Sequence, residues 1–176
     1  MVMKRGDNNM IKVVLVLIVF CCACCADKLR LTKTPFTGNQ LRMDGYYYEH
    51  FEDGNYYYPL ILYSNGIVMY GDAGTDLKIL EEKYLDEKWL EHVKNTQSWW
   101  GIYQIGDNSI KIEMWYHSNA WFFHAYIRSG KILNDTTFVL TTIERSGKPW
   151  TKEERYRKYH FKQFSPKPDS TNIFIK

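Results

Sequence analysis

The chain has 176 residues, of which 45% are hydrophobic and 24% are charged, a composition typical of a globular domain and not of a disordered chain. The formal net charge of +3 comes without a long block of Lys or Arg, which argues against a nucleic-acid-binding protein. All four cysteines fall within residues 21–25, which excludes a disulfide framework in the rest of the chain.

The N-terminal residues have the pattern of an export signal. Lys4, Arg5 and Lys12 precede an apolar run at residues 13–20, and the cysteine-rich stretch 21–25 follows at once. A positively charged start followed by a short apolar run is typical of a secretory signal. The run is well short of the ~20 residues that a membrane-spanning helix needs. We therefore predict a signal peptide, with translation starting at Met1 or at Met10.

A cysteine directly after the apolar run resembles the lipobox of bacterial lipoprotein signals. Cys24 is the best candidate, because the small residue Ala23 precedes it. The resemblance implies that residues 1–23 are removed and that Cys24 carries acyl chains such as palmitate. It also implies a protein anchored by lipid in the bacterial cell envelope, and we expect the outer membrane. An ordinary cleaved signal peptide and a metal-binding cysteine cluster are the alternatives.

Residues 24–40 show little periodicity and contain Pro35 and Gly38, so we predict a tether between the lipid and the folded domain. From residue 41, strand-forming runs alternate with turn residues. Asn65-Gly66 between two apolar runs predicts a type I′ hairpin turn, in which both residues have positive φ. We also predict a turn at Ser129-Gly130 and a polar loop at residues 146–149. The predicted strands cover residues 41–50, 56–64, 67–70, 99–105, 110–116, 121–128, 136–144 and 156–164, with a short piece at 131–133.

A single helix is predicted near residues 77–94. Asp76 is a suitable N-cap. Apolar residues then recur at steps of three and four, which gives the helix one apolar face, while the opposite face carries mixed charge. We expect this helix to pack over a sheet or over a barrel mouth. The apolar positions are Leu77, Leu80, Tyr84, Leu85, Trp89 and Val93.

The order of these elements predicts an all-β fold with one added helix. Short turns join about eight strands, and no β-α-β alternation occurs, so a parallel sheet is not expected. An antiparallel meander of this length closes into a barrel, because closure removes the exposed edges. A sandwich is the alternative architecture. The folded domain is expected to span residues 41–165, and residues 166–176 form a tail over the surface.

Three stretches resemble lipocalin-like domains. The hairpin formed by residues 100–105 and 110–112, with its Gly-x-Tyr-x-Ile and Asn-x-Ile-x-Ile pattern, is similar to a hairpin repeated in that family. Residues 132–138 resemble the short strand and turn that follow, and Gly45-Tyr46-Tyr47 corresponds to the first strand, with Tyr where the family often has Trp. The resemblance covers residues 41–165 and implies a lipocalin-like barrel on an envelope lipoprotein.

No pattern in the sequence indicates catalysis. It contains no nucleophile elbow, phosphate-binding loop or dinucleotide-binding glycine pattern. His117 and His124 flank a predicted turn with Glu113 nearby, an arrangement compatible with a metal site, but ordinary surface and barrel positions are the simpler interpretation. We therefore predict a protein that is not an enzyme and that uses no cofactor and no metal.

Aromatic residues are unusually frequent, at 16% of the chain. The tyrosine runs 46–48 and 56–58 would place rings on both faces of their strands, to line a pocket, to stack on sugar rings or simply to fill a barrel. Tyrosine hydroxyls inside a barrel need hydrogen-bond partners, which favours a mixed cavity over a wholly apolar one.

Two functions remain open on this basis. One is binding of a small hydrophobic or amphipathic ligand in the barrel, with Tyr103, Trp115 and Tyr126 pointing inward as lining residues. The other is a solid-packed barrel that contacts another protein or a glycan through its surface. In either case the expected partners include the membrane, through the N-terminal lipid, and no nucleic acid.

Overall fold

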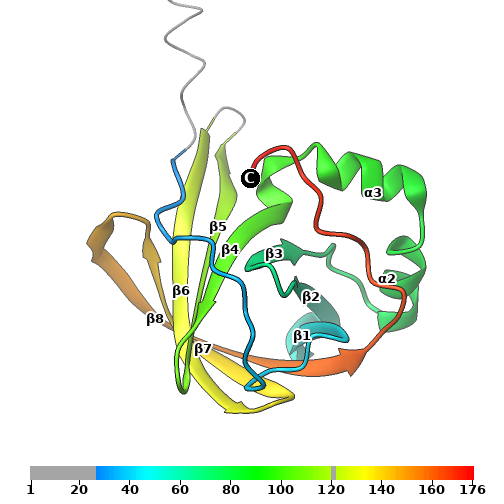
Figure 1. Cartoon of the computed structure of the whole chain (residues 1–176), viewed down its shortest axis with the longest axis horizontal. Coiled ribbons are helices and arrows are strands. Elements are labelled where there is room, and N and C mark those ends of the chain that lie inside the picture. Colours follow the sequence, from blue (N-terminus) through cyan, green and yellow to red (C-terminus); the bar gives the residue numbers. More distant parts are fainter. Residues whose placement is uncertain (1–26, 120–121) are drawn as a thin grey trace, which may run out of the picture.

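The structure, a computed structural model, describes residues 27–119 and 122–176 and contains a closed barrel of eight antiparallel strands (Figure 1). Each strand pairs with the next along the chain, and β1 closes the barrel by pairing with β8. The predicted all-β meander and its closure into a barrel are confirmed, and the sandwich is not adopted. The strands are β1 (Gly45–Phe51), β2 (Tyr56–Leu62), β3 (Ile67–Tyr70), β4 (Trp100–Ile105), β5 (Ser109–Asn119), β6 (Phe122–Asn134), β7 (Thr137–Arg145) and β8 (Lys148–Gln163).

The last strands are longer than predicted. Strand β6 continues through Ser129-Gly130 in place of the predicted turn, and the pairing with β7 shifts register at that point. A side chain at Gly130 would collide with the carbonyl oxygen of Val139, so the glycine permits a bulge with close strand approach. The predicted loop at 146–149 is also wrong, because β8 begins at Lys148 and only Ser146-Gly147 separates it from β7.

The hairpin between β2 and β3 has a different turn from the one predicted. Gly66 has a φ of 85°, but Asn65 is not among the residues with positive φ, so the turn is not type I′. The Gly66 N–H donates to the Tyr63 carbonyl at 3.0 Å, and the Tyr63 N–H donates to the Ile67 carbonyl at 2.9 Å. This is a three-residue loop that ends in a left-handed glycine, another common hairpin connection.

The predicted helix is two helices, α2 (Leu77–Lys83) and α3 (Glu87–Lys94). Asp76 caps α2 as predicted, accepting the Lys78 N–H at 2.7 Å. Asp86 starts the second helix in the same way, because its carboxylate accepts the backbone N–H of Lys88 at 2.9 Å. Both helices cover the outer face of the barrel beside β1–β4, as the side view in Figure 1 shows, and not its mouth.

Alternating strand residues build two cores, one inside the barrel and one outside it. The interior core contains Tyr47, Leu60, Leu62, Tyr103, Ile112, Met114, Phe138 and Tyr159. The outer core lies between the strands, the two helices and the chain ends, and contains Tyr46, Ile61, Met69, Tyr84, Val93, Trp100, Ile102 and Trp115.

The two chain ends belong to the folded domain. Residues 27–40, expected to be a tether, instead lie along the barrel, where the Asp27 N–H donates to the Phe123 carbonyl at 3.0 Å and the Phe36 N–H to that of Ser64 at 2.7 Å. We call these residues the N-terminal segment. The C-terminal tail runs back over the outer surface (Figure 1), and Ile175 is buried in the outer core.

Candidate functional site

The two ends of the barrel interior differ in chemistry. At the end that carries the β2–β3, β4–β5 and β6–β7 turns, called here the closed end, aromatic rings fill the interior. The ring centroid of Phe138 lies 4.9 Å from that of Tyr159 and 5.0 Å from that of Tyr47, and Phe161 packs 5.3 Å from Tyr47. Leu41 is buried beside them. These rings leave no space between them, but a hollow of about 340 Å³, lined in part by Phe36, Tyr103 and Ile105, opens beside the β4–β5 turn.

Charged side chains lie inside the barrel toward its other end, called here the open end. We name Glu49 on β1, Arg128 on β6 and Arg157 on β8 the interior charge cluster. Arg157 Nη1 lies 2.8 Å from Glu49 Oε2. Burial raises the pKa of Glu49, although the charge and hydrogen bond of Arg157 oppose that shift. The cluster has two positive charges and one negative charge.

Arg128 is the unpaired member of the interior charge cluster. Its side chain is buried, with 8% of the residue exposed, and no carboxylate of a described residue forms an ion pair with it. Its guanidinium lies over two aromatic rings instead, 5.0 Å from the ring centre of Tyr116 and 6.0 Å from that of Tyr70. Cation–π contacts of this kind stabilise the charge but leave hydrogen-bond donors available.

A hollow of about 580 Å³ opens above Arg128 on the inner face of β5–β8. Its wall combines aromatic, aliphatic and charged side chains, so it is neither a wholly apolar nor a wholly polar site. Such a combination of apolar walls with a few polar groups is typical of small-molecule sites. Its lining residues include Tyr116, Tyr126, Arg128, Ile143, Arg145 and Arg155.

A second buried polar group lies at the base of this region. The hydroxyl of Tyr159 is fully buried and has no hydrogen-bond partner among the described residues. A buried hydroxyl without a hydrogen-bond partner costs folding free energy. Burial also disfavours the charged phenolate, which raises the pKa of Tyr159 well above its ordinary value.

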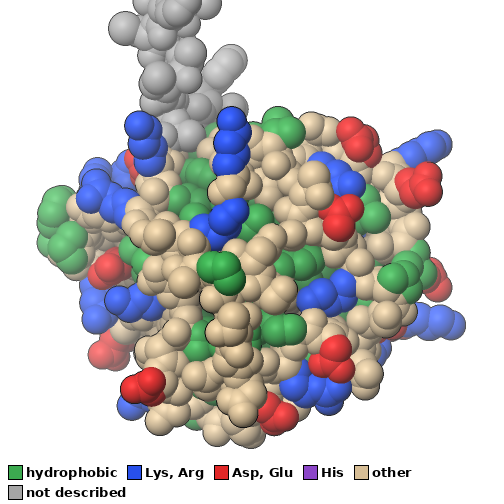
Figure 2. Space-filling view, viewed as in Figure 1, with side chains coloured by type: hydrophobic (Ala, Val, Ile, Leu, Met, Phe, Trp, Pro, Cys, Tyr) green, Lys and Arg blue, Asp and Glu red, His purple; other side chains and the backbone are tan. Residues whose placement is uncertain are grey.

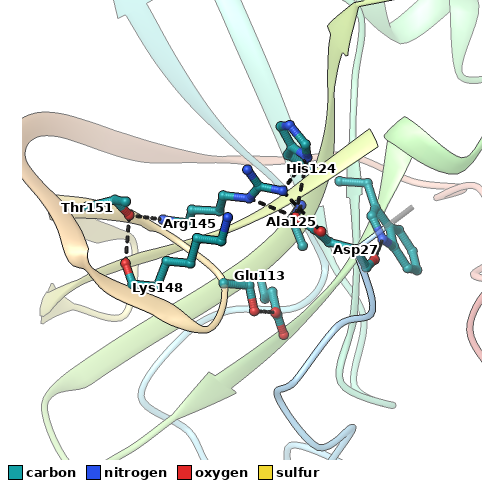
Figure 3. Close-up of polar contacts among 9 residues, drawn as sticks. Asp27, Glu113, His124, Ala125, Arg145, Lys148 and Thr151 are labelled. Atoms are coloured by element: carbon teal, nitrogen blue, oxygen red, sulfur yellow. Dashed lines mark hydrogen bonds and ion pairs between the residues drawn. The ribbon is translucent and has the colours of Figure 1, made fainter. Parts of the chain in front are cut away.

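One wall of the hollow is tied to the N-terminal segment (Figure 3). Arg145 lines the hollow and donates from Nε to Asp27 Oδ2 at 3.0 Å and from Nη2 to His124 Nδ1 at 2.8 Å. Burial alone would raise the pKa of Asp27, but the hydrogen bond and charge of Arg145 hold that pKa below its usual value. The start of the described chain is therefore attached to the open end of the barrel.

Glu113 fixes the next residues of the N-terminal segment. It projects outward from β5 and is fully buried beneath the segment. Its Oε2 accepts the backbone N–H of Arg30 at 2.7 Å and that of Leu31 at 2.6 Å, and its Oε1 accepts the Ser146 hydroxyl. In the sequence, Glu113 stands out only as a neighbour of His117 and His124, and nothing there indicates this structural role.

The three residues predicted to line a cavity lie in three different places. Tyr126 borders the hollow. Tyr103 is inside the barrel but at the closed end, where its hydroxyl donates to the Tyr63 carbonyl at 2.7 Å. The expected inward orientation of Trp115 is wrong: it lies in the outer core, and its indole N–H donates to the Asp27 carbonyl at 2.6 Å. Cys24 lies outside the described residues.

The histidines considered as metal ligands make other contacts. His117 packs on Phe123 with ring centres 4.1 Å apart, and His124 accepts from Arg145. Across residues 27–119 and 122–176, no group of three or more His, Cys, Asp or Glu residues is placed to hold a metal ion. Helices in these same ranges are all too short or too polar to cross a bilayer.

Comparison with known proteins does not assign the chain to a group. No protein-family model, no curated protein and no solved structure matches it. The assignment of function therefore depends on the geometry of the open end.

Proposed function

We propose that this is a non-enzymatic, lipid-anchored protein of the bacterial cell envelope whose lipocalin-like barrel binds a small amphipathic ligand at its open end. The buried, unpaired Arg128 below a hollow of about 580 Å³ is the observation that carries the proposal. A charge enclosed without a partner is costly, and such departures from good packing are expected where a protein binds or reacts. Because aromatic rings fill the interior at the closed end, the hollow at the open end is where we expect the ligand to bind.

The lipid anchor is the first testable part of this proposal. Protein purified from its host's membranes should carry acyl chains on Cys24 and partition into detergent, because several chains together bind a bilayer stably where one does so only marginally. Mass spectrometry of the N-terminal peptide measures this directly. Cys24→Ala should abolish the modification, whereas Cys25→Ala should leave it intact. An unmodified N-terminus downstream of Cys25 would contradict the prediction.

The anchor would bring the open end close to the membrane. Cys24 precedes Asp27 by three residues, which reach at most about 11 Å when fully extended. Asp27 in turn contacts Arg145 at the rim of the hollow. Figure 2 shows Lys and Arg side chains near the point where the described chain begins. Lys28, Lys33 and Lys176 line one crevice there, and anionic lipid head groups attract such lysines.

Ligand binding is tested with a neutral fluorescent dye such as N-phenyl-1-naphthylamine. We expect a saturable rise in dye fluorescence, and Tyr126→Ala should weaken binding about fivefold by removing ~1 kcal/mol of aromatic contact. Tyr156→Ala is the matched control, because Tyr156 is 71% exposed. Equal weakening by both variants, or no saturable binding by the wild type, would argue against a site in the hollow.

One observation favours contact with another protein or a glycan as the second candidate. The β7–β8 hairpin projects from the barrel at the left of Figure 1, and Figure 2 shows hydrophobic side chains at that edge. Trp150 next to its turn is 77% exposed. An exposed tryptophan of this kind is a common anchor in interfaces. Failure of the dye to bind would leave this function as the better supported one.

A further inference from the structure

The interior charge cluster is not electrically balanced. Glu49 and Arg157 form a close pair, with 2.8 Å between Oε2 and Nη1, and this leaves the charge of Arg128 as a net positive charge inside the barrel. Charges interact strongly where water is excluded, so an anion that enters this region is attracted more strongly than at the surface. The hollow is also lined by Glu144, Glu153 and Arg155, but Arg128 is the buried one of its charged side chains, so a ligand with one negative charge would meet the cation of Arg128 inside the barrel.

The position of Arg128 makes it available to such a ligand. It borders the hollow, and in the described part of the chain it has no carboxylate partner. A guanidinium presents several N–H donors in one plane, an arrangement that fits the two oxygens of a carboxylate. The Tyr116 and Tyr70 rings contact the guanidinium of Arg128 and hold it in place. These contacts leave N–H groups of the guanidinium free to donate to the carboxylate of a ligand.

The surroundings limit the size of the ligand. Below the cluster, Phe138 and Tyr159 stack with centroids 4.9 Å apart and an interplanar angle of 13°, and both residues are fully buried, so rings occupy the space that a long alkyl chain would need. Within the hollow, Tyr116 and Tyr126 offer aromatic surface, with centroids 5.7 Å apart. A short aromatic or aliphatic body fits beside these rings, and a long fatty-acid chain does not.

We infer that the hollow binds a small organic monocarboxylate, with the carboxylate paired to Arg128 and its short body against Tyr116 and Tyr126. This inference rests on the proposed function and names the ligand class of the same site. Arg128 thus recognises the charge of the ligand, and Tyr126 packs against the uncharged part of the ligand.

The experiment is a titration of the full-length protein in detergent with benzoate, benzamide, phenyl phosphate and palmitate, followed by isothermal calorimetry at pH 7. Benzoate should bind at least about tenfold more tightly than benzamide, which has the same body without the charge. It should also bind more tightly than phenyl phosphate, whose second negative charge exceeds that of the site. Palmitate should not compete with benzoate.

The variant Arg128→Gln should weaken benzoate binding at least about tenfold and weaken benzamide binding much less, because only benzoate loses a charge-assisted pair. Arg42→Gln is the matched control, because Arg42 pairs with Asp44 on the surface at the closed end. Thermal unfolding of Arg128→Gln reports whether it is folded. If the variant is not folded, the comparison of benzoate with benzamide binding to the wild-type protein still tests the inference.

The outcomes separate this inference from the function on which it rests. Saturable binding of the neutral dye, combined with equal affinities for benzoate and benzamide, would overturn the carboxylate site and retain ligand binding. Tighter binding of phenyl phosphate or palmitate would overturn the ligand class. Failure of both the dye and benzoate to bind would overturn the proposed function as well.

Discussion

Glu113→Ala is expected to lower the free energy of unfolding by about 3 kcal/mol, because it removes a buried acceptor shared by three donors. The carboxylate of Glu113 is fully buried and accepts the backbone N–H groups of Arg30 and Leu31 and the Ser146 hydroxyl. Alanine leaves these donors without a partner and opens a cavity beneath the N-terminal segment. Denaturant unfolding of the wild type and variant measures the difference.

The loss of stability in Glu113→Ala should be greatest in the N-terminal segment that Glu113 contacts. We expect faster hydrogen exchange at the Arg30 and Leu31 amides in Glu113→Ala, because local opening then releases the N-terminal segment. Glu113→Gln keeps one acceptor oxygen and should fall between the wild type and the alanine variant. Glu154→Ala is the control, since Glu154 is exposed on β8, and should change stability by less than about 0.5 kcal/mol. Protection of Arg30 and Leu31 that is unchanged in Glu113→Ala would refute this role.

The barrel could be predicted because its strands carry strong local signals. Turn residues separate β-rich runs, and a chain of antiparallel neighbours has few ways to bury its edges other than closure. The helix was less accurately predicted, because its apolar spacing continues through Leu85, which is 56% exposed. The predicted helix has Asp86 in its interior, whereas the Asp86 side chain caps α3. A search for a second N-cap would have revealed two helices.

The site was harder to predict, because both faces of the central strands are buried. On β4, Tyr103 faces the interior while Trp100 and Ile102 face the outer core. Hydrophobicity therefore does not distinguish inward from outward positions, and a shift of one residue exchanges the two faces. The pairing of Tyr103 with Ile112 fixes the register and sends Trp115 outward. Neither the helices nor the chain ends that cover this outer face could be placed from local sequence.

Arg128 was missed for a related reason. In the run Tyr126-Ile127-Arg128, an apolar residue precedes the arginine, and a charged residue in a strand is normally assigned to the solvent face. Pairing of Arg128 with Ile112 instead places it on the inner face. Alternation places Arg128 on the same face as Tyr126, two residues earlier, so an inward Tyr126 already implies an inward Arg128. The rule that a charged strand residue faces solvent conceals this, because a site with a buried charge violates that rule.

Gly66→Val is expected to lower the free energy of unfolding by about 3 kcal/mol, for two independent reasons. Gly66 has a φ of 85°, which a β-branched residue strongly resists. A Cβ there would also lie 2.5 Å from the Thr34 carbonyl oxygen, so the N-terminal segment would have to move. The variant should therefore weaken the hairpin and the contact of the segment with it.

The same substitution at another turn provides the control for Gly66. Gly106 lies between β4 and β5 without a positive φ, and a Cβ there would approach only the Ser109 hydroxyl, a small side chain that can rotate away. Gly106→Val should therefore cost much less than Gly66→Val in denaturant unfolding. Equal losses would mean that left-handed geometry contributes little at Gly66. A loss confined to Gly66→Val, accompanied by faster exchange of the Phe36 amide that donates to Ser64, would show that the β2–β3 turn and the N-terminal segment stabilise each other.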